Sequence, residues 1–280
     1  MDRIAIVTDS TCDLKPELVK EMGVTMVPLK VTLNEENYYD KIDITSSEFM
    51  DLLEETDELP TTSQPAVGDF VATYEDLASD YDVIISLHIS EEMSGTLKSA
   101  NLAAKMVDDV EVKVIDSRLV TAPLGVMVSE VAKAVGDNKS VEEIIDLIKE
   151  LRENINIYFT VDELDYLEKG GRIGKAAAFL GGIFNVKPIL SIADGVIVPH
   201  KKVRGEKRLF RTLKKLVAKD LKNKPGQRLV ILHGKYEDKA NKLKELMEEE
   251  FEWDEVEMLQ LGPVVGAHVG PTPFGVITLK

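Results

Sequence analysis

Hydroxyl side chains at the start of a helix are the first feature with chemical potential. The pattern of residues 84–104 predicts a buried strand, a short polar loop, and a helix that begins near Ser94, Gly95 and Thr96. A helix N-terminus presents unpaired N–H groups and partial positive charge, so hydroxyl donors there suit an anion. Ser94 is also a favoured helix cap, and taken alone the motif favours that simpler role.

A second group of hydroxyls lies between two prolines. Thr61, Thr62 and Ser63 stand between Pro60 and Pro65, which stiffen the segment and bias it toward extended geometry. A rigid polar loop suits ligand binding. The alternative is that Ser63 caps a helix predicted over residues 67–78, and composition leaves both interpretations open.

The third feature is a single histidine in a segment rich in glycine and proline. His268 lies within residues 262–271, which we expect to form a loop. A lone histidine is more often structural than functional. The surrounding glycines nevertheless indicate a backbone shaped for close approach.

Basic residues gather on one predicted helix, residues 204–221. Its apolar side would pack on a sheet, while its other side carries lysines and arginines that continue a basic run from Lys201 through Arg204. On an acidic chain this face suits docking to an anionic partner, although a solvated helix face is the plainer interpretation.

The first half of the chain, which contains both groups of hydroxyls, is predicted to alternate between strands and helices. Strands expected at 4–8, 24–31, 83–89 and 111–115 alternate with helices, which indicates a mostly parallel sheet with helices on both faces. Asp9, Ser10 and Thr11 follow the first strand. They either face a ligand crevice or belong to a turn in which Asp13 caps the next helix.

The second half changes character. Residues 156–161 alternate in polarity, a short helix over 162–168 ends in glycines beside Arg172, and residues 175–184 suggest an alanine-rich helix. Asp194-Gly195 between apolar runs predicts a hairpin. We therefore expect an α/β fold: an N-terminal domain (1–154) with a mostly parallel sheet, and a C-terminal α+β domain (155–280) with antiparallel strands.

Composition limits the functional classes. The 280 residues carry a net charge of −16, which argues against nucleic acid as a main partner. The single cysteine, Cys12, excludes an internal disulfide, and no metal-ligand spacing occurs. No apolar run reaches the length of a membrane span, and no signal peptide is evident, so we expect a cytoplasmic protein.

The polar segments together carry a resemblance. VTDSTCDL, PTTSQP, SGTLKSA, DYLEKGGRIG, VKPIL, DGVI, KVRG and GPVVGAHVGP occur in this order over the whole chain. The ordered set resembles the DegV family, the bacterial fatty-acid-binding proteins that include the acyl-presenting subunit of fatty acid kinase.

The resemblance implies a long-chain fatty acid buried between and within two domains, with no cofactor. It assigns the carboxylate to Thr61, Thr62, Ser63, Ser94, Gly95 and His268. It places Arg172 and Arg204 on a surface facing a kinase partner. It also implies no stable membrane insertion, with transient membrane exchange possible. Such a protein would present the carboxylate for acyl-phosphate formation and would not itself be an enzyme.

Some positions depart from the family pattern. Residues 118–123, beginning with Arg118, replace a usual run of small residues, and Thr272 to Gly275 replace a commoner glycine-alanine form. These changes bear on the tunnel and its lid, and they remove none of the carboxylate donors.

Two enzyme hypotheses compete with this interpretation. A Ser–His hydrolase would use Ser94 and His268, although Ser94 lies outside a G-x-S-x-G elbow and no acid partner is apparent. A phosphate- or nucleotide-binding enzyme lacks the G-x-x-x-x-G-K-[ST] loop.

Overall fold

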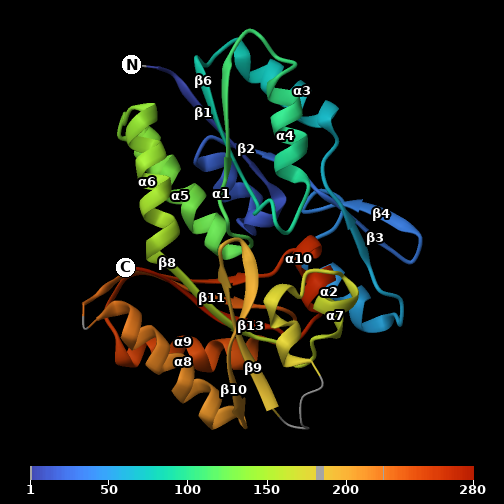
Figure 1. The fold of residues 1–280 in the computed structure, drawn as a ribbon, viewed down its shortest axis with the longest axis vertical. Helices are drawn as coiled ribbons and strands as arrows, with labels where there is room; N and C mark the ends of the chain where they lie inside the picture. Colours follow the sequence, from blue (N-terminus) through green and yellow to red (C-terminus); the bar gives the residue numbers. More distant parts are fainter. Residues whose placement is uncertain (1, 181–185, 223) are drawn as a thin grey trace.

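The computed structural model describes residues 2–180, 186–222 and 224–280 (Figure 1). Its N-terminal half is built on a four-stranded parallel sheet of order β2-β1-β6-β7. The strands are β1 (Ile4–Asp9), β2 (Val24–Val27), β6 (Val83–His88) and β7 (Glu111–Asp116). The helices of this half are α1 (Pro16–Glu21), α2 (Ser46–Glu55), α3 (Val67–Ala78), α4 (Thr96–Ala104), α5 (Ala122–Gly136) and α6 (Val141–Asn154).

Alternation along the strands gives this sheet two buried faces. Ala5 and Val7 of β1 pack with buried side chains of α3 and α4, whereas Ile6 between them belongs to the core that includes α5. Helices therefore cover both faces, and the predicted α/β organisation of this half is confirmed.

The C-terminal half contains a six-stranded sheet of order β10-β9-β8-β13-β11-β12. Its strands are β8 (Ile155–Thr160), β9 (Val186–Ala193), β10 (Val196–Arg204), β11 (Gly226–His233), β12 (Trp253–Gln260) and β13 (Phe274–Leu279). The β11–β12 pair is parallel and the other pairs are antiparallel. Helices α8 (Glu206–Leu221) and α9 (Glu237–Glu250) pack on one face through their apolar sides.

A small antiparallel sheet of order β4-β3-β5 corrects two predictions. Its strands are β3 (Lys30–Leu33), β4 (Glu36–Tyr39) and β5 (Thr61–Ser63). The strand predicted over 24–31 is two strands in different sheets, because Pro28 cannot donate a ladder hydrogen bond. The turn predicted over 34–39 is mostly β4, and the turn itself is formed by Asn34 and Glu35, both with positive φ.

Three short helices complete the C-terminal half: α7 (Asp165–Lys169), a 3-10 helix η2 (Gly174–Phe179) and α10 (Pro263–Val269). The loop predicted over 262–271 is therefore largely helical. Of the helix predicted over 175–184, the first part is η2, and residues 181–184 lie outside the described residues. The Asp194-Gly195 hairpin is confirmed, with both residues at positive φ.

One core cluster connects the two halves. It runs from β1 and α5 through β8 to β13, and α10 contributes Ala267 and Val269. The domain boundary predicted near Asn154 falls at the junction of α6 and β8. None of the helices that the structure describes is long and apolar enough to cross a membrane.

Candidate functional site

A cavity of about 320 Å³ lies where segments from both halves meet. The start of α4, strand β5, helix α10 and the turn after α7 all contribute to its wall. Most lining side chains are apolar: Leu29, Ile89, Met93, Val120, Ile157, Phe159, Leu167, Ile192, Ile197, Leu232, Leu261, Val264, Val265, Val269, Pro273 and Phe274. The polar ones are Thr11, Thr62, Ser63, Gln64, Ser94, Thr121, Arg172 and His268. An apolar cavity with a few converging polar groups is the usual form of a small-molecule site.

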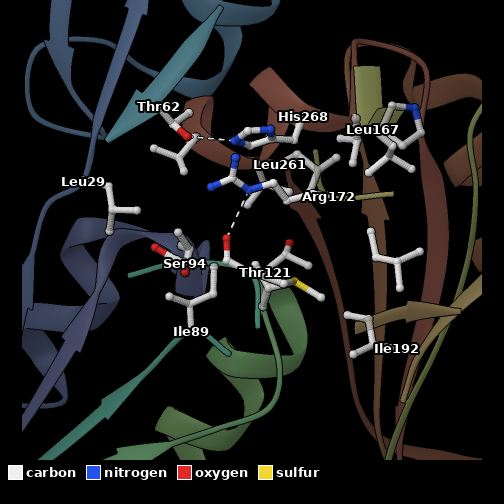
Figure 2. A pocket seen from close by; sticks show the side chains of 18 of the residues that line it. Leu29, Thr62, Ile89, Ser94, Thr121, Leu167, Arg172, Ile192, Leu261 and His268 are labelled. Carbon is white, nitrogen blue, oxygen red and sulfur yellow. Dashed lines mark hydrogen bonds between the residues drawn. The ribbon is translucent and has the colours of Figure 1, made fainter. Parts of the chain in front are cut away.

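Thr62 and His268 form the upper edge of the polar region in Figure 2. Thr62 Oγ1 lies 2.8 Å from His268 Nε2, and strand β5 holds Thr62 by pairing it with Val31. His268 Nδ1 is buried without a hydrogen-bond partner among the described residues. Burial, and then the nearby charge of Arg172, lower the pKa of His268 to about 4. The imidazole is therefore neutral at physiological pH.

Hydrogen bonding favours the tautomer of this neutral ring that carries its proton on Nε2. A proton on Nδ1 would have no acceptor, whereas a proton on Nε2 is donated to Thr62 Oγ1. Thr62 is then free to donate its own hydroxyl proton into the cavity.

Ser94 occupies the lower edge of the same region (Figure 2). Its hydroxyl accepts a hydrogen bond from Thr96 N–H at 3.3 Å and lies 2.9 Å from Thr96 Oγ1. Helix α4 begins at Thr96 with Gly95 as its N-cap residue, so the predicted position at the helix start is confirmed. The Ser94 hydroxyl thus contacts the helix terminus while it lines the cavity.

Gly95 leaves space for the side chain of Gln64. A Cβ at Gly95 would lie 1.8 Å from Gln64 Oε1, and Gln64 Nε2 donates to Ser99 Oγ at 3.0 Å. Gln64 therefore connects the segment after β5 to α4 through the space that glycine leaves open. The family resemblance assigns Gly95 to the ligand carboxylate; Gly95 lines the cavity, but the space beside its Cα holds the Gln64 side chain.

Arg172 lies between the Thr62–His268 pair and Ser94 (Figure 2). Its Nε donates to Met93 O at 3.1 Å and its Nη1 donates to Gly170 O at 2.8 Å. A guanidinium has five N–H donors, so others remain for a ligand. The sequence resemblance placed Arg172 on a docking surface, whereas the structure places its guanidinium in the cavity wall, part-buried.

Helix α10, which carries His268, is anchored at its start and along its length. Gly262 N–H donates to Asp13 Oδ1 at 3.0 Å, and Lys41 Nζ lies 3.2 Å from the same carboxylate. Further along the helix, a Cβ at Gly266 would lie 2.7 Å from Met50 Cε of α2. Close packing of α10 against α2 thus depends on this glycine and fixes where His268 points.

The remaining predicted residues are Thr61, Ser63 and Arg204. Thr61 is exposed and lines a neighbouring hollow of about 260 Å³, and Ser63 lines the main cavity. Ser63 does not cap α3, because the N-cap residue is Ala66, whose N–H donates to Asp69 Oδ2. Arg204 is exposed at the end of β10, away from the cavity lining.

Three polar lining residues were not assigned from the sequence: Thr11, Gln64 and Thr121. Thr11 belongs to the strand end whose role was left open. Asp9 accepts hydrogen bonds from Thr11 N–H and Oγ1, while Asp13 binds Thr121 and Gly262 and does not cap α1. Gln64 lies within the PTTSQP segment, and Thr121 lies within residues 118–123, the segment that departs from the family pattern.

The geometry offers little to a Ser–His hydrolase. Ser94 and His268 bond to Thr96 and Thr62 respectively, and no carboxylate of the described residues bonds to His268 Nδ1. A nucleophile needs a base within reach and an acid that orients the base. The arrangement is instead a set of hydrogen-bond donors around an apolar space.

Comparisons with known proteins bear on what this cavity is. The family model described as "Uncharacterised protein, DegV family" matches residues 3–280. A DegV domain-containing protein of Halalkalibacterium halodurans is 40% identical over 276 residues, covering 98% of each chain. A solved DegV family protein from Thermus thermophilus, described by its fatty acid binding, has a TM-score of 0.94 at 34% identity over 99% of each chain. DegV from Bacillus subtilis, described as a fatty acid binding protein, has a TM-score of 0.90 at 34% identity over the full length of both chains. The chain belongs to the DegV family.

Proposed function

We propose that the cavity binds a long-chain fatty acid, with its carboxylate between Thr62, Ser94 and Arg172 and its tail along the apolar wall. The observation that carries this proposal is the convergence of these donors in a cavity lined mostly by aliphatic and aromatic side chains. The solved relatives described as fatty-acid-binding proteins support the choice of ligand.

Each polar group has a defined part in this proposal. Arg172 supplies positive charge and a planar fork that matches a carboxylate. Thr62 donates its proton because His268 occupies its acceptor side, and Ser94 adds a donor beside the N-terminus of α4. Several donors are needed because a buried carboxylate loses its hydration.

The apolar wall supplies the larger part of the affinity. Burial of each methylene contributes about 0.8 kcal/mol, so a long acyl chain gains far more than its ordering costs. The polar groups then set the direction in which the chain enters, since only one end of the ligand can satisfy them.

Lipid extraction and mass spectrometry of the purified protein test this function. A co-purified long-chain acid, and a larger rise in melting temperature on adding oleate than on adding methyl oleate, are the expected results. The methyl ester is the matched control because it keeps the tail and removes the charge. Absence of any acyl chain together with no oleate-dependent stabilisation would contradict the proposal.

We also propose that the protein presents the bound carboxylate to a fatty acid kinase and does not act as an enzyme itself. The basic run that includes exposed Arg204 supports a docking surface on a chain of net charge −16. The docking role of Arg172 stays a prediction. A cytoplasmic location and brief membrane exchange of the lipid fit this role.

Arg204→Glu tests the docking surface. We expect this variant to retain its lipid and to lose phosphorylation of the bound acid by a partner kinase, with Asp76→Ala on the exposed side of α3 as an unaffected control. Unchanged transfer by Arg204→Glu would show that the basic run is only a solvated face.

A further inference from the structure

Another hollow, of about 500 Å³, adjoins the lipid cavity and shares only Ile192 with its described lining. It is bounded by the last turn of α6, the loop that follows β7, and the tip of the β9–β10 hairpin, which rises toward the N-terminal half in Figure 1. Arg118, Lys149 and Arg152 line it. Arg118 belongs to the segment that departs from the family pattern, and the proposed lipid function leaves it unexplained.

Two of these cations lack carboxylate partners. Neither Arg118 nor Arg152 forms an ion pair with any of the described residues, although the chain has 50 acidic residues. Arg152 Nη2 donates to the backbone oxygen of Asp116, and Arg152 Nε is buried with no hydrogen-bond partner. Lys149 pairs with Asp146, but both side chains are exposed and the pair is readily opened.

The two guanidinium groups also repel one another. Burial and then the charge of Arg118 lower the pKa of Arg152, and the nearby Asp116 carboxylate only partly opposes them. One oxygen of that carboxylate already accepts from the N–H groups of Arg118 and Glu91. A bound anion would relieve both the desolvation and the repulsion.

The rest of the wall indicates the kind of anion. The exposed carboxylates of Glu153 and Asp194 also line the hollow and can accept hydrogen bonds from the rest of a ligand, while Leu119, Ile155 and Ile192 form an apolar side. Arginine forks match tetrahedral phosphate oxygens bidentately. The volume exceeds what one bare anion needs, and it falls in the range of pockets for small organic ligands.

We propose that Arg118 and Arg152 form a binding site for the phosphate group of a small soluble phosphate, separate from the donors Thr62, Ser94 and Arg172 of the lipid cavity. The apolar side and the carboxylate acceptors suit an organic group with hydroxyl or amino donors. Free phosphate shares the same recognition chemistry and is distinguished by experiment.

The backbone conformation at Arg118 allows its side chain to be removed without strain. Its φ is +59°, a conformation that glycine adopts without strain. Arg118→Gly therefore removes the guanidinium while it relaxes the chain, and we expect a melting temperature no lower than that of the wild type. Loss of binding in this variant would not be the result of misfolding.

Calorimetric titration at constant ionic strength tests the site with adenosine 5′-monophosphate, inorganic phosphate and adenosine as probes. We expect saturable binding of the monophosphate, at least about tenfold weaker binding by Arg118→Gly, and unchanged binding by Arg211→Ala on the exposed side of α8. Arg152→Lys, which keeps the charge but loses the fork, should also weaken binding.

Tighter binding of the monophosphate assigns the site to an organic phosphate, and equal binding of inorganic phosphate assigns it to free phosphate. The proposal is overturned if neither probe binds, if adenosine binds as well as its monophosphate, or if Arg118→Gly binds like the wild type. It is also overturned if Arg211→Ala loses binding, because the phosphate would then lie on the basic helix.

Discussion

Two histidines in this protein each share a hydrogen bond with a hydroxyl group, and they differ at the other ring nitrogen. His88 bonds to Ser86 Oγ through Nε2 at 2.6 Å and to Asp9 Oδ2 through Nδ1 at 3.0 Å. His268 bonds to Thr62 through Nε2, while its Nδ1 has no partner among the described residues. The first group is fully buried, and the second lines a cavity.

The His88 cluster has the connectivity of a catalytic triad, Asp9–His88–Ser86, without its function. Ser86 also lies 2.7 Å from the Tyr74 hydroxyl, so every member is engaged and none is exposed. A satisfied buried network holds strands β1 and β6 together and has no capacity left for a ligand. Donor capacity that faces an apolar cavity, as at Thr62, Ser94 and Arg172, is the better indicator of a binding site.

The largest effect should follow from breaking the satisfied network. Asp9→Ala removes the acceptor for Thr11 N–H, Thr11 Oγ1, Ile89 N–H and His88, all of them buried. We expect the free energy of unfolding to fall by about 3–5 kcal/mol, measured by urea denaturation. Asp76→Ala on the exposed side of α3 is the control and should change it by less than about 0.5 kcal/mol. Equal losses in the two variants would contradict the structural role.

Substitution of the cavity hydroxyls should affect fatty acid binding more than stability. Thr62→Ala and Ser94→Ala should each weaken fatty acid binding by about 1–3 kcal/mol, because a buried carboxylate loses a donor, and they should destabilise the fold less than Asp9→Ala does. Competition with a fluorescent acyl probe measures the affinity. Thr61→Ala distinguishes the family resemblance from the structure. The resemblance predicts weaker fatty acid binding, whereas the structure predicts unchanged binding. Retention unchanged in both Thr62→Ala and Ser94→Ala would remove the site assignment.

A smaller effect concerns pH. The pKa of His268 falls to about 4 in the fold from an ordinary value of 6.5, so the unfolded chain binds a proton more readily over that window. Stability contributed by the neutral ring is therefore lost as the pH falls from about 6.5 to about 4. The pKa of Asp40, raised to about 7 by burial, acts in the other direction, since its contribution is lost as the pH rises.

The pH effect is isolated by difference. Urea midpoints of the wild type and His268→Gln, measured between pH 4 and 8, should converge as the pH falls, because the wild type loses the contribution of the neutral His268 ring. The titration of Asp40 is common to both proteins and cancels in the difference. A difference that is constant with pH would show that His268 does not titrate below its ordinary range.

The smallest effect should come from Gly95→Ala. The new Cβ displaces the Gln64 amide and breaks its hydrogen bond to Ser99, which costs about 0.5–1.5 kcal/mol in the free energy of unfolding. Gln64→Ala should cost a similar amount, and the double variant should add little. Fully additive losses would mean that Gly95 acts independently of Gln64.

Local signals in the sequence predicted the elements that depend on local chemistry. Asp194-Gly195, between two apolar runs, forms the expected hairpin turn. In the site, Ser94, Thr62 and His268 were predicted together only through the family resemblance. The structure brings them to one cavity, although 174 residues separate Ser94 from His268.

The features that could not be predicted from the sequence, helix α10 and the position of Arg172, depend on tertiary contacts. The segment of α10 is typical of a loop because Gly262 precedes the helix and Pro263 and Gly266 lie within it. Proline nevertheless suits the first helical position, and Gly266 permits contact with α2. The position of Arg172 depends on the carbonyl of Met93, 79 residues away in the chain. No local pattern reports such a contact.

Carbon-13 NMR of carboxyl-labelled oleic acid bound to the protein tests the central claim most directly. The account predicts one bound carboxyl resonance whose pKa lies below that of an ordinary carboxylic acid, because Arg172 and the hydroxyl donors favour the ionised form. Ser94→Ala and Thr62→Ala should each raise that pKa. A bound carboxyl that titrates identically in the wild type and both variants would contradict the account.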